Sequence, residues 1–312
     1  MLYDYWKNHQ DFPLRTIIIV CTVILTFAAL KVFGRKLPRD KGREFAVNGE
    51  LSQGKLRGAG LIMFSVFVLC SAIFTKMDTQ QIINLGLIFA AMMTGYLDDS
   101  AKEPWGELRK GICDLVIAGG ITANFIYHNN LSIMFFGDVV TVPTPLYAVL
   151  GVILVWVSIN VVNCTDGVDG LCASLSLATV FFLMQVYQPY VETAFVMLGV
   201  LAAYLWFNAS PSSMLMGDAG SRAIGVYIAL FAMQCRQPLL FLPFAAVMIL
   251  DGGLGLFKLT VIRVTRKKDF MSRLRTPLHD HFRKNLGWSD SQVVTRFVIF
   301  QLVLCTAVFM AL

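Results

Sequence analysis

The stretch LYAVLGVILVWVSI at residues 146–159 runs directly into NVVNCTDGVDG at residues 160–170. The first part is apolar enough to form most of a membrane-spanning helix. The second part holds two amides and two carboxylates within eleven residues. Because Asn and Asp are costly to place at the edge of a bilayer, this cluster indicates a functional site.

The composition of the chain points to a membrane protein. Of its 312 residues, 56% are hydrophobic and 15% are charged, and the mean hydropathy is +0.66. Soluble domains average about 25% charged residues. The apolar stretches do not alternate with polar residues as the strands of a β-barrel do. We therefore predict one all-α, polytopic integral membrane domain over residues 1–312, with cytoplasmic active-site loops.

Apolar stretches recur along the whole chain and predict about ten transmembrane helices. They lie at residues 14–33, 58–75, 81–97, 111–128, 146–163, 171–187, 191–207, 222–235, 238–262 and 292–312. Between the fourth and fifth, residues 129–145 carry turn signals around the run VVTV. That pattern predicts a small β-hairpin on the outer side.

The distribution of Lys and Arg predicts the orientation in the membrane. Most bases fall in odd-numbered loops, above all in residues 31–57 and 263–284. By the positive-inside rule these loops face the cytoplasm, and both termini lie outside. The run at 160–170 and three others then share the cytoplasmic side, namely LDDS at 97–100, MGDAGS at 216–221 and PLHDH at 277–281.

Two further features concern cysteines and the first apolar stretch. The seven cysteines form no C-x-x-C pair and mostly lie inside apolar stretches. We expect them to be small buried hydrophobes, not disulfides or zinc ligands. Residues 1–13 contain two acids and one base, unlike the start of a cleavable signal, so we expect the first apolar stretch to be retained as a helix.

Asp98 and Asp99 directly follow an apolar stretch. Adjacent helical residues point about 100° apart, so we expect the two carboxylates to serve different partners. One would hold a metal or take a proton. A helix that simply ends in solvated acids has the same pattern, so this pair alone is a weak signal.

Three other acids suggest a metal site. Asp166 and Asp169 are three residues apart and would share one face if a helix begins there. Asp218 lies between Gly217 and Gly220, in a turn that would open the eighth predicted helix. Carboxylate and amide oxygens without clustered Cys favour Mg²⁺ or Mn²⁺ over zinc. The ordinary alternative for each acid alone is a helix cap or turn.

His279 and His281 lie in a strongly basic loop. Such a loop attracts phosphate groups, and it also attracts the anionic headgroups of the inner leaflet whatever the function. Acidic metal sites beside a basic loop suit a phosphate-bearing substrate, since Mg²⁺ and cations neutralise the charge that builds up in phosphoryl transfer.

The motifs together carry a family resemblance. They are LDD at 97–99, N-x-x-N-x-T-D-G-x-D-G-L at 160–171, FN at 207–208, M-G-D-x-G-S at 216–221 and P-L-H-x-H-F at 277–282. In this order, over nearly the whole chain, they resemble the polyprenyl-phosphate N-acetylhexosamine-1-phosphate transferases. The last motif, with GW at 287–288 and RF at 296–297, is most similar to the phospho-MurNAc-pentapeptide transferases of that superfamily.

The resemblance implies ten helices and a homodimer in the bacterial cytoplasmic membrane, with the active site in a cytoplasmic cleft. It implies that undecaprenyl phosphate attacks UDP-MurNAc-pentapeptide and gives lipid I and UMP, with Mg²⁺ or Mn²⁺ as cofactor, in peptidoglycan synthesis. The expected partners are these two substrates and the lipid bilayer, without nucleic acid.

The resemblance also implies roles for individual residues. Asp218 would ligate the metal, and Asp98 and Asp99 would engage the lipid phosphate and the diphosphate, one of them as a base. His279 would contact the phosphates or the sugar. The other positions that match substrate-binding residues of the family are Asn160, Asn163, Asp166, Asp169, Asn208, Lys102, Lys110 and His281.

Three positions depart from the family pattern. A middle histidine is replaced by Asp280, and the usual Phe before M-G-D is Leu215. The loop SQGKLRGAG at 52–60 lacks the family's lysine at its usual place, and we expect Lys55 or Arg57 to substitute for it.

These departures keep one close alternative open, an enzyme that moves GlcNAc-1-phosphate to the same lipid. An ion-coupled transporter is an alternative of another class. It would carry its ionisable groups near the middle of the membrane, whereas here they gather at one interface. A membrane scaffold without activity is the third alternative.

Overall fold

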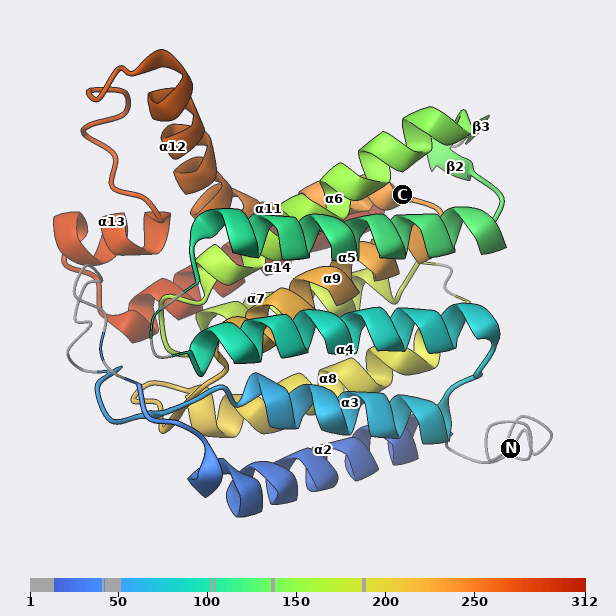
Figure 1. The fold of residues 1–312 in the computed structure, drawn as a ribbon, viewed down its shortest axis with the longest axis horizontal. Coiled ribbons are helices and arrows are strands. Elements are labelled where there is room, and N and C mark those ends of the chain that lie inside the picture. The colour runs from blue at the N-terminus through green and yellow to red at the C-terminus, as the bar shows by residue number, and fades with distance from the viewer. Residues whose placement is uncertain are drawn as a thin grey trace.

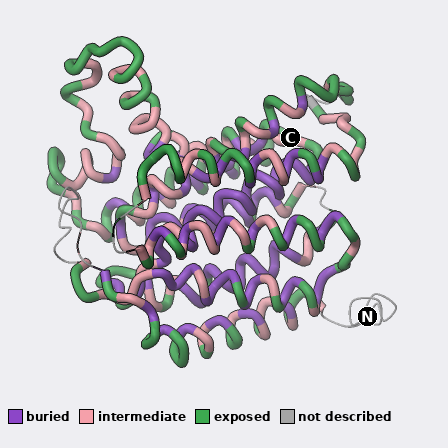
Figure 2. Tube along the Cα trace, viewed as in Figure 1, coloured by how far each residue is buried: buried purple, intermediate pink, exposed green. Residues whose placement is uncertain are grey.

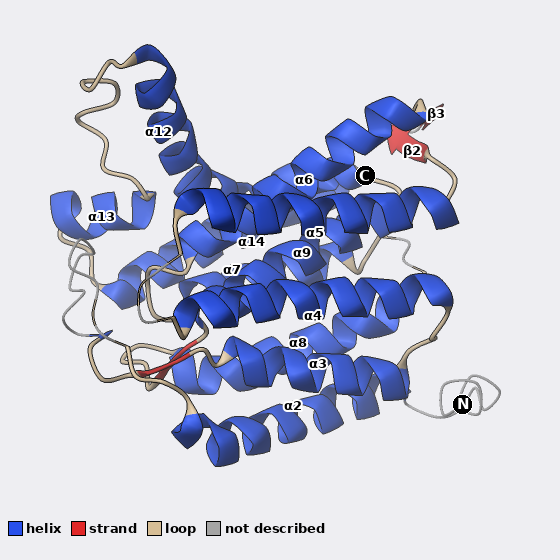
Figure 3. Cartoon of the chain, in the orientation of Figure 1, coloured by secondary structure: helices blue, strands red, loops and turns tan. Residues whose placement is uncertain are grey.

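The computed structural model describes residues 14–40, 42, 52–101, 103, 105–135, 138–186 and 189–312. The described chain is mostly helical and contains very little sheet, which confirms the predicted all-α class (Figures 1 and 3). The helices are α2 (Leu14–Phe33), α3 (Gly60–Phe74), α4 (Thr79–Asp99), α5 (Glu107–His128), α6 (Thr144–Thr165), α7 (Leu171–Leu183), α8 (Val191–Asn208), α9 (Gly217–Gln234), α10 (Phe241–Phe244), α11 (Ala246–Met248), α12 (Leu254–Thr265), α13 (Leu278–Leu286) and α14 (Asp290–Ala311), with short helical turns η1 (Gly34–Lys36), η3 (Pro238–Leu240) and η4 (Ile249–Gly253).

Five of the described helices are long and apolar enough to cross a membrane: α2 extended through η1, α4, α6, α8 and α14. A sixth span results if the bent segment from η3 to α12 is counted as one. Helices α3 and α7 are apolar but shorter. Each of the ten predicted ranges contains helix, while the count of ten spans stays a prediction.

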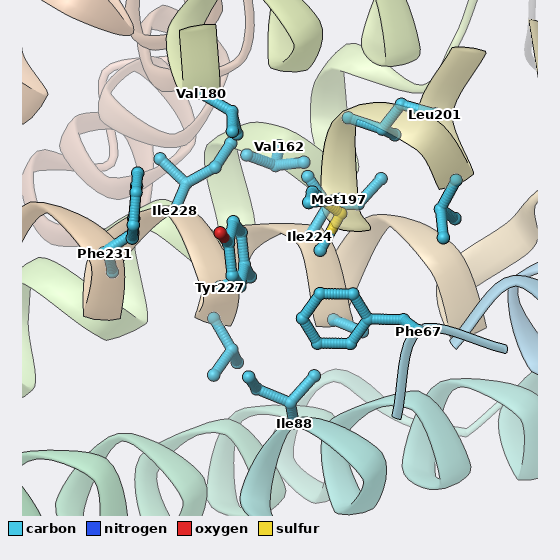
Figure 4. Packing of buried hydrophobic residues seen from close by; sticks show 14 of the residues in the cluster. Phe67, Ile88, Val162, Val180, Met197, Leu201, Ile224, Tyr227, Ile228 and Phe231 are labelled. Carbon is cyan, nitrogen blue, oxygen red and sulfur yellow. The ribbon is translucent and has the colours of Figure 1, made fainter. Parts of the chain in front are cut away.

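Helix α9 is the centre of the bundle. Every residue of α9 except Asp218 is buried, and α3, α4, α6 and α7 pack around it. Figure 4 shows part of this core, where Phe67 of α3 and Ile88 of α4 face Tyr227 of α9. A helix that is buried on all sides is expected to be apolar all round, and residues 223–233 of α9 fit this expectation. The buried residues form a continuous core in Figure 2.

Glycines allow α3 and α4 to touch the first turn of α9. A Cβ atom at Gly60 would lie 2.1 Å from the backbone nitrogen of Gly220, and one at Gly95 would lie 2.3 Å from the carbonyl oxygen of Asp218. Small residues at helix contacts are typical of membrane bundles, because packing of the backbones replaces the hydrophobic effect there. The ends of α3 and α4 are thereby held against Asp218.

The prediction of one continuous helix over residues 238–262 was wrong. The segment is broken, and the part before Ala245 is bent by 70° from the part that follows. Pro243 lies in α10 and removes a backbone donor, and η4 is a π-helical turn. Beyond this turn α12 contains no buried residue and projects away from the bundle in Figure 1.

Two short strand pairs complete the described fold. Strands β2 (Ser132–Phe135) and β3 (Asp138–Thr141) are antiparallel, which confirms the predicted hairpin. Strands β1 (Leu56–Arg57) and β4 (Met214–Leu215) pair in parallel and lie at the opposite end of the bundle (Figure 3). The seven cysteines all lie in the described residues and form no disulfide, as expected, and four of them are buried.

Candidate active site

Acidic and basic side chains from four elements meet at one end of the bundle. Asp98 and Asp99 end α4, Lys110 lies in the first turns of α5, Asp218 is the second residue of α9 and Arg57 lies on β1. Hydrogen bonds and ion pairs join these side chains to one another. The structure therefore brings together side chains that are far apart in the sequence.

Asp99 is held by a base and by the start of α9. Its Oδ1 accepts a hydrogen bond of 2.9 Å from Nε of Arg57, and its Oδ2 accepts one of 3.2 Å from the backbone nitrogen of Ala219. The same guanidinium donates to Oδ1 of Asp40 at 2.9 Å and lies 3.8 Å from Oδ1 of Asp218. Arg57 thus faces three carboxylates. Gly217, with φ of +68°, leaves no room for a Cβ beside Asp99.

Asp98 has different partners, as the sequence predicted. Its Oδ1 accepts a hydrogen bond of 2.7 Å from the backbone nitrogen of Trp105, and its Oδ2 forms an ion pair with Lys110. Nζ of Lys110 also donates to Oδ2 of Asp218 at 3.3 Å. The amine of Lys110 therefore lies between carboxylates from α4 and α9.

The charges of Lys110 and Asp218 stabilise each other. Burial lowers the pKa of Lys110, but Asp218 and Asp98 outweigh it, so that the pKa lies above its ordinary value. Burial raises the pKa of Asp218, but Lys110 and other bases outweigh it and the pKa lies below its ordinary value. At neutral pH the amine is charged and Asp218 is ionised.

A second cluster surrounds Asp169. Its Oδ2 accepts hydrogen bonds of 2.9 Å from Nζ of Lys55 and from the backbone nitrogen of Ser212. Nζ of Lys55 also donates to Oγ of Ser212 at 2.9 Å. The parallel pairing of β1 with β4 brings the loop at 52–57 to this place. Both residues expected to replace the family's lysine, Lys55 and Arg57, thus contact acids of the site.

His279 is buried, not exposed in a basic loop as its sequence neighbours suggested. It lies in the first turn of α13 with 2% exposure. Its backbone nitrogen donates to Oδ1 of Asp251 at 2.7 Å, and its Nδ1 lies 2.8 Å from Oδ2 of the same carboxylate. A Cβ at Gly167 would lie 2.3 Å from Nε2 of His279, so this nitrogen faces the run at 160–170.

Asn208 serves the backbone of the site. It is buried, its Oδ1 accepts from the backbone nitrogen of Gly170 at 2.9 Å, and its Nδ2 donates to the carbonyl of Met214 at 2.8 Å. Gly170 has φ of +85°, a conformation that favours glycine. Asn208 therefore links the turn before α7 to β4.

The remaining predicted residues differ in their placement. Nδ2 of Asn160 donates to the carbonyl of Trp156 in its own helix at 2.8 Å, and the carbonyl of Asn163 accepts from the backbone nitrogen of Asp166 at 3.1 Å. His281 accepts a hydrogen bond of 3.3 Å from the backbone nitrogen of Arg275 and is not joined to the acids by any described contact. Lys102 lies outside the described residues.

Asp166 and Asp169 would share one face only if a helix began at this point, and no helix begins there. Helix α6 ends at Thr165 and α7 begins at Leu171, so the two acids lie in the turn between them. Asp166 is the C-cap of α6, and Gly170, with positive φ, is the N-cap of α7. The carboxylate of Asp169 turns toward Lys55 instead of continuing a helical face.

The sequence analysis did not assign roles to Asp40, Asp114 and Asp251. All three are buried and each is paired with a base or with His279. The available signal for Asp114 and Asp251 was an acid inside a mostly apolar stretch. Asp40 gave no such signal, since it lies in a charged segment.

Carboxylates of the candidate site could provide part of the coordination shell of a divalent cation. Within the part of the chain that the structure describes, no three His, Cys, Asp or Glu side chains converge as a complete metal cage. Mg²⁺ usually binds one or two carboxylates and completes its shell with water and substrate phosphate. Asp218 with Asp98 fits that requirement, because an oxygen of each contacts the amine of Lys110 between them.

The arrangement suits a substrate with a diphosphate. Carboxylates alone repel phosphate, but here Arg57, Lys110 and Lys55 lie among them with fixed hydrogen bonds. Such bases can hold phosphate oxygens and neutralise charge on a leaving phosphate.

Comparisons with known proteins identify the family of the chain. Residues 81–236 match the model of glycosyl transferase family 4. The chain is 38% identical over 302 residues to a phospho-N-acetylmuramoyl-pentapeptide-transferase of Treponema pallidum, in a match that covers 88% of this chain and 83% of that protein. Proteins of the same name from Desulfotalea psychrophila and Clostridium acetobutylicum are 29% and 27% identical, over 91% and 81% of this chain and 89% and 83% of their own.

Proposed function

The chain belongs to glycosyl transferase family 4 and to its phospho-N-acetylmuramoyl-pentapeptide-transferases, and on this premise we propose that it forms lipid I. The reaction moves phospho-MurNAc-pentapeptide from UDP-MurNAc-pentapeptide to undecaprenyl phosphate and releases UMP. The observation that carries the proposal is the cluster of Asp98, Asp99 and Asp218 with Lys110 and Arg57, at the end of a membrane bundle.

In this reaction an oxygen of the lipid phosphate attacks the phosphorus that bears the sugar. The bond from that phosphorus to the bridging oxygen breaks, and the oxygen leaves with UMP. Lys110 and Arg57 neutralise the negative charge that gathers on the phosphates, and the acids hold both bases in place. Asp98 or Asp99 takes any proton that remains on the attacking phosphate.

Mg²⁺ bound by Asp218 would supply further charge neutralisation at the diphosphate. Lys55 and Asp169, which contact each other at 2.9 Å, would bind the nucleotide. His279, whose Nδ1 is fixed by Asp251, presents Nε2 toward the turn at 166–170 and would contact a phosphate or the sugar.

The test offers two UDP-sugars to the purified protein in lipid or detergent. With undecaprenyl phosphate and Mg²⁺, we expect UMP release from UDP-MurNAc-pentapeptide and not from UDP-GlcNAc. Release from UDP-GlcNAc alone would favour the GlcNAc-1-phosphate transferase. Release from neither sugar, with uptake of solute into vesicles, would favour a transporter. Loss of release with EDTA and recovery with Mg²⁺ test the cation.

We further propose a homodimer in the bacterial cytoplasmic membrane with its active site toward the cytoplasm. The relatives' names, the apolar helices and the basic loops around the site support this arrangement. Mass measurement of the protein in nanodiscs tests the dimer, and a monomer that turns over at the full rate would contradict it.

A further inference from the structure

A buried ion pair lies next to the Lys110–Asp218 contact and has no part in the mechanism above. Nε of Arg222 on α9 donates to Oδ1 of Asp114 on α5 at 3.1 Å, and Nη2 of Arg222 reaches the same oxygen. Arg222 is 2% exposed and Asp114 is 4% exposed. The charges are therefore remote from solvent.

The two ion pairs form a ladder between α5 and α9. Lys110 and Asp114 are four residues apart on α5, and Asp218 and Arg222 are four apart on α9, so each pair shares one face of its helix. On α5 the base precedes the acid, and on α9 the acid precedes the base. Opposite charges therefore meet in both contacts, Lys110 with Asp218 and Asp114 with Arg222. The rung at Lys110 borders the site, and the rung at Arg222 is buried.

A third contact ties the buried rung to Lys110 itself. Nη2 of Arg222 donates to the backbone carbonyl of Lys110 at 3.2 Å. One guanidinium thus holds the carboxylate one turn below Lys110 and the backbone from which Lys110 extends. The position of the amine between Asp98 and Asp218 follows from this restraint.

The buried ion pair of Arg222 and Asp114 is not expected to contribute much to the stability of the fold. Nη1 of Arg222 is buried and makes no hydrogen bond to any described residue. A buried donor without a partner costs free energy, and buried ion pairs are often no more stabilising than apolar side chains of the same size. We therefore look for the role of this ion pair in the groups that it holds in position, above all the backbone of Lys110.

We propose that Arg222 and Asp114 are positioning residues that hold the amine of Lys110 at the diphosphate. The inference rests on the proposed function, since it gives Lys110 a phosphate to bind. It adds a role for two residues that touch neither substrate.

The main test replaces the pair by apolar side chains in Arg222→Met/Asp114→Leu. We expect a thermal midpoint near that of the wild type, because neither partner is left as an unpaired charge. We expect kcat for UMP release to fall about 100-fold, the effect of a misplaced charged group, while KM for the UDP-sugar changes less than about threefold. Unchanged kcat in the folded variant would overturn the proposal.

A double-mutant cycle asks whether the pair acts through Lys110. In a Lys110→Ala background, the same two replacements should lower kcat little further, because the amine they position is absent. A full additional loss of about 100-fold would show that the pair acts by another route and would overturn the proposal.

A second readout needs no turnover. Reductive methylation followed by mass spectrometry should modify Lys110 faster in the double variant than in the wild type, with Lys258 as internal reference. An unchanged rate would contradict the positioning role. If wild-type protein released no UMP, the proposed function would fail, and the methylation rates would still test the restraint on Lys110.

If the double variant does not fold, Arg222→Lys replaces it. The shorter amine keeps its charge opposite Asp114 but cannot also reach the carbonyl of Lys110. We expect kcat to fall about tenfold with faster methylation of Lys110. Wild-type values for both would overturn the proposal.

Discussion

Gly167 lies against the imidazole of His279, for which we propose a role in catalysis. A Cβ here would lie 2.3 Å from Nε2 and 2.7 Å from Cε1 of His279. In Gly167→Ala the imidazole must move, and we expect kcat to fall at least about tenfold with a small change in thermal midpoint. The matched control is Gly119→Ala, where a Cβ meets nothing within 4 Å. Equal kcat in both variants would remove His279 from the mechanism.

Asp218 permits the most direct test of the acidic cluster. Asp218→Asn keeps the size of the side chain but removes the charge opposite Lys110 and the ligand proposed for Mg²⁺. We expect no measurable UMP release and retained folding, checked by turnover and thermal denaturation. Full activity of this variant would exclude Asp218 from the metal site and would suit a scaffold.

The sequence singled out Asp98, Asp99, Asp169, Asp218 and Lys110, and the structure shows each of them in an ion pair of the candidate site. The sequence also predicted that the adjacent acids serve different partners. It could not show the burial of His279, because the partner Asp251 comes from a distant helix. It also could not show that Asn208 binds the backbone of Gly170, since spacing does not distinguish a ligand from a local restraint.

Polar side chains of α14 and α7 stabilise the broken helix between α10 and α12. Gln301 of α14 is fully buried, its Oε1 accepts from the backbone nitrogen of Val247 at 2.9 Å, and its Nε2 donates to the carbonyl of Phe244. Backbone groups freed by a break inside a membrane must find such partners. Hydropathy did not reveal the break, because residues on both sides of it are apolar.

We therefore expect Gln301→Leu to lower the free energy of unfolding by about 2 kcal/mol, since it leaves the buried backbone nitrogen of Val247 unpaired. The carbonyl of Phe244 keeps the hydroxyl of Thr179, which donates to it at 2.7 Å. Denaturation in detergent micelles measures the loss. The control is Gln185→Leu, because Gln185 is exposed and its side chain bonds to a carbonyl of its own helical turn. Equal stability of the two variants would show that the break needs no support from α14.

Helix α4 begins with a charged cap whose effect depends on pH. Asp78 accepts from the backbone nitrogen of Gln81 at 2.9 Å and from the hydroxyl of Tyr190 at 2.8 Å. Burial raises the pKa of Asp78, but these hydrogen bonds and Lys76 outweigh it, so the pKa lies below its ordinary value. A lowered pKa means that the ionised cap stabilises the fold above an ordinary pKa near 4 and loses this effect as the pH falls through the lowered value.

Asp78→Ala should accordingly be less stable than the wild type by about 1 kcal/mol at pH 7, and by less at pH 3. Thermal midpoints at both pH values measure the difference. Asp138→Ala, at an exposed position of the hairpin, should show no such convergence. A difference that stays constant with pH would mean that the charge of Asp78 plays no part in the cap.

For the whole molecule, the orientation can be tested by chemical labelling. Cysteines introduced by Val139→Cys in the hairpin and Ser272→Cys after α12 occupy exposed positions. In intact spheroplasts an impermeant maleimide should label only the first, and after permeabilisation it should label both. Wild-type protein provides the control for the native cysteines. Labelling of both positions from outside would contradict the predicted topology.

The burial pattern of α9 has a practical consequence. Its only residue that is not buried is the acid that we assign to chemistry, and the rest of the helix supports the packing of four neighbours. Changes at most positions of α9 would therefore impair assembly and catalysis together. A replacement of Asp218 alone would yield a folded but inactive protein. Such a variant is suitable for trapping both proposed substrates for structure determination.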